Sequence, residues 1–246
     1  MTPYRASNVA LLDAEGFPYC TQGFAMKEPM SSRLVQRIAG AWLGLGLAGL
    51  TLLCSAEATG ASALDTVQSF YDTLLTTMRR GNELGQSGRF IQLQPVVHTI
   101  FDVPFMARMA IGSGWATVSS AQQQQVIEAF ERYIAAIYAD RFDTYSGEQL
   151  QILGEQLSDA GTVVMTRIVD SNGEPENLNY LMRSHGSMWQ IADVFLNGTI
   201  SELAIRRSEF ASIRQRQGVD GLIAELIRKA DLLSAPSSST LSHADR

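Results

Sequence analysis

Residues 119–153 read SSAQQQQVIEAFERYIAAIYADRFDTYSGEQLQIL, and the spacing of the apolar residues changes within this stretch. Ser119 and Gln122 make a capping-box pattern, and from there to Phe142 the apolar residues recur at helical spacing. They fall on one helix face: Val126, Ile127, Phe130, Ile134, Ile137 and Tyr138. After Gly147 apolar residues alternate with polar ones, which is typical of a strand. A long helix followed by strands indicates the α+β class.

Four strands are predicted after this helix. We place them at residues 149–153, 162–169, 178–183 and 188–196. The segments between them are short and carry the turn sequences Asp159-Ala160-Gly161, Ser171-Asn172-Gly173 and His185-Gly186-Ser187. Short turns between alternating strands predict an antiparallel meander.

Further helices are predicted before the long helix. Apolar spacing indicates one at residues 63–78, where Ser62 and Asp65 make a capping box, and another at 89–101. Pro95 either bends this second helix or marks its start. A short third helix follows Pro104 and stops at residues 111–112.

Two more helices are predicted after the strands. Thr199 and Glu202 indicate the start of the first, Gly218 its end, and the second spans residues 220–233. The expected fold is therefore a curved antiparallel sheet of about four strands packed against helices. Its interior is either a filled core or an apolar cavity, and apolar spacing alone does not distinguish the two.

An export signal is predicted near the N-terminus. Residues 38–56 are uncharged and mostly apolar, and they follow the basic residues Lys27, Arg33 and Arg37. The stretch is shorter than the ~20 residues that span a bilayer and ends in small residues, so we expect cleavage after Ala56 and a periplasmic location. An uncleaved membrane anchor is the alternative. Lipidation of Cys54 is disfavoured because a leucine precedes it.

Three regions follow from this prediction. Residues 1–56 are the leader, with the true start at Met1, Met26 or Met30; residues 57–233 are the folded domain; residues 234–246 are a serine-rich tail expected to be disordered. The whole chain has a net charge of -6, which disfavours nucleic acid as a partner. Both cysteines, Cys20 and Cys54, lie in the leader, so the exported domain has neither a disulfide nor a thiol nucleophile.

Catalytic and metal-binding patterns are weak in the exported domain. His98, His185 and His243 have no ligand or base at a useful spacing, so we expect no metal, no cofactor and no catalytic triad. Asp102 or Asp193 beside a tyrosine in an apolar pocket would suit a proton-abstracting base. The structural alternatives are a helix cap for Asp102 and an ion pair, for example with Arg167, for Asp193.

Several short motifs occur in an order that resembles the MlaC family, also called the toluene-tolerance family. They are Ile111-Gly112-x-x-Trp115, Phe130-x-x-Tyr133, Tyr145-Ser146-Gly147, Trp189 to Asp193, and Gly218-Val219-Asp220-Gly221-Leu222. The resemblance covers roughly residues 64–233. Residues 70–75, 129–133 and 140–142 look closer to the branch associated with hopanoid biosynthesis.

This resemblance implies a non-enzymatic periplasmic lipid carrier that binds phospholipid or hopanoid tails in an apolar cavity and shuttles them between the inner and outer membranes. It also implies two partners, an inner-membrane lipid transporter and an outer-membrane lipid complex. Lysine-based docking to them is in doubt because Lys229 is the only lysine after residue 56; Arg206, Arg207, Arg214 and Arg216 are possible substitutes. The alternatives are an NTF2-like pocket enzyme acting on an apolar ring substrate, and an adaptor that binds no lipid.

Helix faces and strand alternation suggest which residues line such a cavity. The predicted lining residues are Leu74, Met78, Phe105, Met109, Phe130, Ile134, Ile137, Tyr138, Val164, Ile168, Tyr180 and Met182. A one-residue change of strand register would instead turn the opposite sheet face inward.

Overall fold

A computed structural model describes residues 61–235 of the chain, and these residues form an α+β fold. The predicted leader, both cysteines, His243 and nearly all of the predicted tail lie outside the described residues. The elements in chain order are α1 (Ala63–Arg79), α2 (Gly81–Ile100), α3 (Val103–Ile111), the 3-10 helix η1 (Gly112–Thr117), α4 (Ser120–Arg141), β1 (Gln149–Ser158), β2 (Gly161–Val169), β3 (Pro175–His185), β4 (Met188–Leu196), β5 (Ile200–Ser201) and α5 (Glu202–Ser234).

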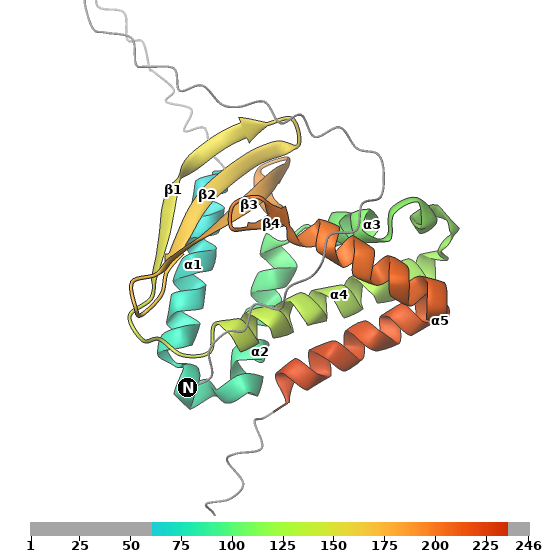
Figure 1. The fold of residues 1–246 in the computed structure, drawn as a ribbon, viewed down its shortest axis with the longest axis horizontal. Helices are drawn as coiled ribbons and strands as arrows, with labels where there is room; N and C mark the ends of the chain where they lie inside the picture. The colour runs from blue at the N-terminus through green and yellow to red at the C-terminus, as the bar shows by residue number, and fades with distance from the viewer. Residues whose placement is uncertain (1–60, 236–246) are drawn as a thin grey trace, which may run out of the picture. The chain divides into compact units, whose positions relative to one another are not determined.

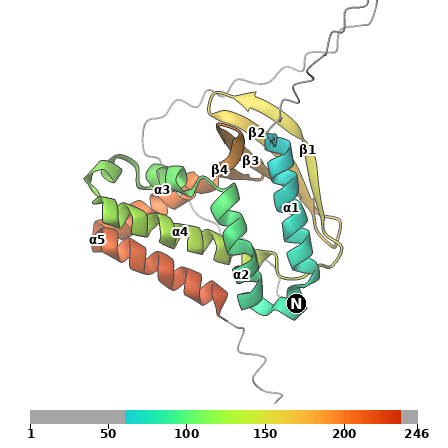
Figure 2. The same ribbon diagram turned by 180° about the vertical axis from the view of Figure 1, so that it is seen from behind.

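The strands form one antiparallel sheet in the order β1-β2-β3-β4-β5, which confirms the predicted meander and adds a short fifth strand. Strand β1 continues to Ser158, beyond the predicted end at Leu153, across a bulge between Ile152 and Gly154. Helix α1 packs along the sheet, while α4 packs against α2, α3 and α5 (Figures 1 and 2). Among residues 61–235, no helix combines the length and the apolar character that crossing a membrane requires.

Short-range signals set most helix boundaries. Ser62 caps α1 in a reciprocal box with Asp65, and the Ser119 hydroxyl accepts a hydrogen bond from the Gln122 amide at the start of α4. Helix α2 begins earlier than predicted, with a break at Gly85, and Pro95 lies within it. The glycine takes φ 60°, a conformation that suits a residue without a Cβ.

The predicted start of the last helical region is wrong by two residues. Thr199 does not cap α5; the Ser201 hydroxyl accepts from the Ala204 amide instead. Residues 200 and 201 still pair with β4, so the chain is extended where the prediction placed helix. At Gly218, where φ is 72°, α5 changes direction sharply, and Figure 1 shows its second half returning beside its first.

The core lies between the sheet and the helices. One sheet face is turned inward, because Val164, Tyr180 and Val194 are opposite one another on adjacent strands and all three are buried. Phe70 and Tyr71 of α1 are fully buried against Tyr180, with ring centroids 6.3 and 5.9 Å from its ring. Aromatic side chains therefore fill the part of the interior beneath α1.

Candidate binding pocket

A cavity of about 310 Å³ lies between α4, the inward sheet face and the first turns of α5. Its apolar lining consists of Met78, Phe101, Met106, Phe130, Ile134, Ile137, Tyr138, Phe142, Leu150, Ile168, Leu178, Val194, Leu196 and Leu203. Its polar lining consists of Arg141, Asp143, Thr144, Glu148, Glu176, Glu202 and Arg206. An apolar space with a few polar groups is typical of a site for a small ligand.

Helix α4 forms one long wall of the pocket. Phe130, Ile134, Ile137 and Arg141 recur at three- or four-residue spacing, so they share one helix face. Phe130 and Arg141 are separated by about 16 Å along the helix axis. The pocket is therefore an elongated slot.

The sheet forms the opposite wall through residues at matched register positions. Leu150 of β1 pairs with Ile168 of β2, which pairs with Glu176 of β3, and Leu178 of β3 pairs with Leu196 of β4. The ends of four strands thus meet at the pocket. Branched aliphatic side chains give this wall a hydrocarbon surface.

Tyr138 separates the pocket from the aromatic part of the core. Its ring is stacked on Phe142 at 5.6 Å and meets Phe70 edge to face at 5.1 Å. Burial raises the pKa of Tyr138 above its usual value, so its phenol is neutral at physiological pH. The tyrosine therefore adds no charge to the apolar lining.

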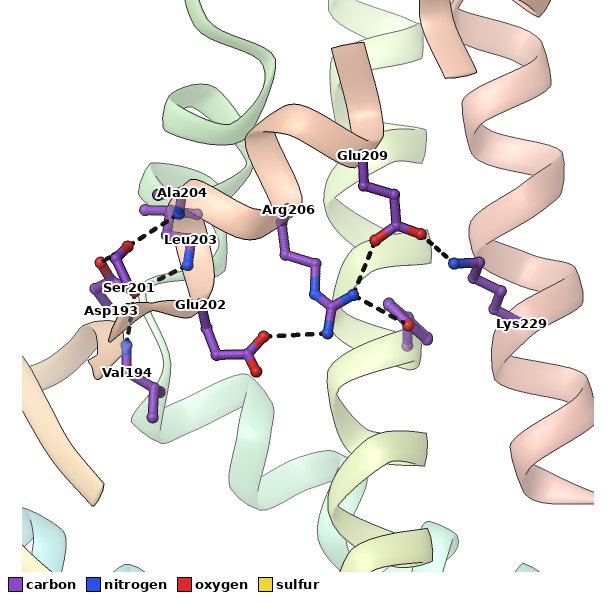
Figure 3. A network of polar contacts seen from close by, with 10 residues as sticks. Asp193, Val194, Ser201, Glu202, Leu203, Ala204, Arg206, Glu209 and Lys229 are labelled. Carbon is purple, nitrogen blue, oxygen red and sulfur yellow. Dashed lines mark hydrogen bonds and ion pairs between the residues drawn. The ribbon is translucent and has the colours of Figure 1, made fainter. Parts of the chain in front are cut away.

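One end of the pocket contains a closed network of charges, drawn in Figure 3. The Arg206 guanidinium donates to Glu202 at 3.1 Å and to Glu209 at 2.8 Å, and Lys229 also pairs with Glu209. Burial opposes the charge on Arg206, but Tyr133, Glu202 and Glu209 outweigh it and raise the pKa of the guanidinium. These ions neutralise one another within the protein.

A second network in Figure 3 joins β4 to the start of α5. Asp193 is buried and accepts hydrogen bonds from the Val194 amide at 2.7 Å, the Leu203 amide at 3.0 Å and the Ser201 hydroxyl at 2.5 Å. Burial raises the pKa of Asp193 although these bonds act in the opposite direction. Because Val194 and Leu203 both line the pocket, Asp193 fixes two residues of its wall.

The other end of the pocket opens at the surface. Arg141, Asp143 and Glu176 are exposed there, and Glu148 is partly exposed. They come from the end of α4, the following loop and the start of β3. The mouth is therefore polar and the interior apolar, as an amphipathic ligand requires.

The twelve predicted lining residues divide into three groups. Those that line the pocket are Met78, Phe130, Ile134, Ile137, Tyr138 and Ile168. Four others face inward but are packed in the filled core, and these are Leu74, Val164, Tyr180 and Met182. Phe105 and Met109 do not line this pocket, because the α3 residue that faces it is Met106. Phe105 lies under the Arg183 guanidinium, 4.0 Å from its ring centroid, and Met109 is 42% exposed.

Sequence reasoning missed several lining residues that strand alternation could have found. Leu178 and Leu196 lie two residues from Tyr180 and Val194 on the same sheet face. The spacing pattern is weaker for Phe101 and Leu203. Phe101 lies just after the end of α2, and Leu203 lies in the first turn of α5.

The carboxylates considered as catalytic bases do not line this pocket. Asp102 caps α3 through the Phe105 amide, as its structural alternative predicted, and also contacts His185 at 2.8 Å. The predicted pair of Asp193 with Arg167 is wrong, because Arg167 donates to Asn177 instead. His98 contacts Glu131 on α4 at 2.9 Å. Within residues 61–235, no group of three His, Asp or Glu side chains is arranged to hold a metal ion.

Comparison with known proteins gives matches at the level of family and of structure. The sequence profile of the family described as "MlaC protein" matches residues 68–228. A solved structure of a phospholipid-binding protein from Ralstonia solanacearum, in complex with a phospholipid, has a similar fold, with a TM-score of 0.60 and 24% sequence identity. The match covers 71% of this chain and 100% of that one. None of the curated proteins matches this chain.

Proposed function

We propose, because this chain belongs to the MlaC family, that its pocket binds a phospholipid by the acyl tails and that the protein carries this lipid between membranes. The observation that carries the proposal is the slot beside α4, which is apolar inside and polar only at its two ends. The similar fold of a phospholipid-binding protein supports the same class of ligand.

Burial of hydrocarbon supplies the binding free energy in this proposal. Each methylene group removed from water contributes about 0.8 kcal/mol, so ten of them contribute on the order of 8 kcal/mol. The aliphatic wall of Ile134, Ile168 and Leu178 suits such chains. Binding of this kind needs no nucleophile or general base, and neither Asp102 nor Asp193 lines the pocket.

The size of the pocket implies movement during binding. At about 310 Å³ the cavity is at the small end of the roughly 300–1,000 Å³ range of ligand pockets. Two acyl chains require more room, so α4 and the sheet must move apart when a lipid enters. A partner that favours the open form would then promote uptake or release.

The cellular setting is part of the proposal. The basic residues and apolar stretch before residue 57 suit export to the periplasm, where a carrier would exchange lipid with an inner-membrane transporter and an outer-membrane complex. The cargo is a glycerophospholipid or, as residues 70–75, 129–133 and 140–142 suggest, a hopanoid.

Native mass spectrometry tests the proposal. The full chain is expressed, and the protein is purified as the cell leaves it, with or without its leader. We expect a bound lipid at about one per chain, and organic extraction distinguishes a phospholipid from a hopanoid. A protein that is lipid-free and remains so after incubation with vesicles of either lipid would contradict the carrier function.

A matched pair of variants connects binding to the pocket. Ile168→Trp fills the slot from β2, whereas Leu153→Trp adds the same ring at a position of β1 that is half exposed and outside the lining. We expect Ile168→Trp to lose most of the bound lipid and Leu153→Trp to retain it. Equal retention by two folded variants would place the lipid elsewhere.

A further inference from the structure

The mouth of the pocket has an unbalanced set of charges. Arg141, Asp143, Glu148 and Glu176 line it, which gives three carboxylates for one guanidinium. Within residues 61–235, none of these four side chains forms an ion pair with another part of the protein. Their charges therefore face whatever occupies the mouth.

These charges converge because three segments end at the same place. Arg141 is the last residue of α4, and Asp143 follows in the loop that leads to β1. Glu148 immediately precedes β1, whose residue Leu150 pairs with Ile168, and Ile168 pairs with Glu176. Local hydrogen bonds hold the loop, since the Glu148 carboxylate accepts from the Ser146 amide at 2.6 Å and Asp143 accepts from the Thr144 hydroxyl at 3.1 Å.

The opposite end of the pocket does not offer a competing site for a charged headgroup. Arg206 is engaged by Glu202 and Glu209, and its side chain is only 16% exposed. A phosphate placed there would have to displace a carboxylate from a partly buried guanidinium. The headgroup is therefore expected at the mouth, beside Arg141 and the three carboxylates.

We propose that this mouth selects lipids whose headgroup bears an amine beyond the phosphate, as in phosphatidylethanolamine, over lipids with an anionic headgroup such as phosphatidylglycerol. Arg141 attracts the phosphate that both lipids share. Asp143, Glu148 and Glu176 attract the ammonium group of the first lipid and repel the uncompensated charge of the second. This inference rests on the proposed lipid-binding function and adds the headgroup class to it.

Competition within one vesicle measures this selectivity directly. The protein is incubated with vesicles that contain phosphatidylethanolamine and phosphatidylglycerol in equal amounts and with identical acyl chains, and the captured lipids are quantified by mass spectrometry. Partly exposed ion pairs are each worth a factor of about two to five, so we expect the captured ratio to favour the amine lipid about fivefold. Raising the salt to 1 M shortens the screening length from about 10 to about 3 Å, and the ratio should then approach one.

Two triple variants of equal charge change assign the effect to the mouth. Asp143→Asn/Glu148→Gln/Glu176→Gln removes the carboxylates of the mouth, and we expect the captured ratio to fall to within about twofold of one. Asp159→Asn/Glu155→Gln/Glu128→Gln removes one Asp and two Glu from exposed positions outside the pocket and should leave the ratio unchanged. Arg141→Gln should reduce the capture of both lipids by similar factors.

The outcomes separate this inference from the function on which it rests. If the unaltered protein captures neither lipid, the proposed function fails. If it captures both equally, or if the two triple variants behave alike, the protein binds lipid but the headgroup inference is overturned. Circular dichroism of each variant shows that a change in the ratio is not caused by unfolding.

Discussion

The two halves of the inward sheet face are both mainly apolar but are differently packed. Around Tyr180 the face is covered by Phe70 and Tyr71 of α1 and has no exposed surface. Further toward the strand ends, Leu178 and Ile168 border a cavity of about 310 Å³. The filled half has rings on both sides, while the hollow half has aliphatic chains opposite α4.

The difference shows that burial of apolar residues and close packing are separate properties of this interior. Edge-to-face rings occupy the space under α1, with Phe70 also 5.5 Å from Phe101. Where side chains are shorter, the helix and the sheet leave room between them. We therefore assign most of the stability of the fold to the filled half and ligand binding to the hollow half.

The largest expected effect comes from removing a ring of the filled half. Phe70→Ala leaves a cavity among four other rings, and we expect the free energy of unfolding to fall by about 3–5 kcal/mol. Ile137→Ala removes a partly exposed side chain that already faces open space, and we expect a loss below about 2 kcal/mol. Chemical denaturation followed by circular dichroism measures both. Equal losses would mean that the hollow half is as closely packed as the filled half.

A bound lipid should contact the hollow half alone. A lipid at one hundred times its dissociation constant raises the free energy of unfolding by about 2.7 kcal/mol if it binds only the folded state. Hydrogen exchange through local opening should then slow at the strand ends near Leu178 and Leu196 and in α4, whereas amides near Tyr71 that exchange by global unfolding should slow by no more than the roughly hundredfold that this rise allows. Slower exchange confined to the segment around Tyr71 would contradict the division into two halves.

The sequence predicts the fold well because local patterns determine its elements. The helical spacing in residues 119–142 and the alternation after Gly147 correspond to α4 and to the meander. The errors occurred where a tertiary contact overrides a local pattern. Thr199 has the right spacing for a cap, but pairing of Ser201 with Phe195 keeps the chain extended there.

The site is harder to predict, because hydrophobicity does not distinguish a wall from a core. Alternation places Ile168 and Tyr180 on the same sheet face, yet only Ile168 borders the cavity. That difference depends on where α1 ends over the sheet, which no residue spacing encodes. Phe105 lies outside the cavity for another reason. An aromatic ring on a helix can also stack under a guanidinium, and the Phe105 ring does so with Arg183.

Two tyrosine hydroxyls of the filled half can be compared in the same way, with a smaller expected effect on stability. The Tyr71 hydroxyl lies 2.6 Å from the Thr166 hydroxyl, whereas the buried Tyr180 hydroxyl lies near the hydroxyls of Tyr71 and Tyr138 but makes no well-aligned hydrogen bond within residues 61–235. Tyr71→Phe should therefore cost about 1 kcal/mol of unfolding free energy, and Tyr180→Phe should cost almost nothing. The same denaturation experiment compares the two variants. A larger loss for Tyr180→Phe would show that its hydroxyl is bonded in solution.

The smallest expected effect concerns Asp193, which holds the wall of the hollow half. Its pKa is raised by burial, so the folded protein keeps the carboxyl proton to a higher pH than the unfolded chain, whose value is near 3.8. The stability gained from this proton is complete below pH 3.8 and is lost as the pH rises through the folded value. Asp193→Asn keeps an oxygen for the Val194 and Leu203 amides and an N–H for Ser201 but does not titrate. Relative to this variant, the unaltered protein should lose stability as the pH rises above 3.8, and parallel stability curves would mean that the hydrogen bonds to Asp193 fully offset its burial.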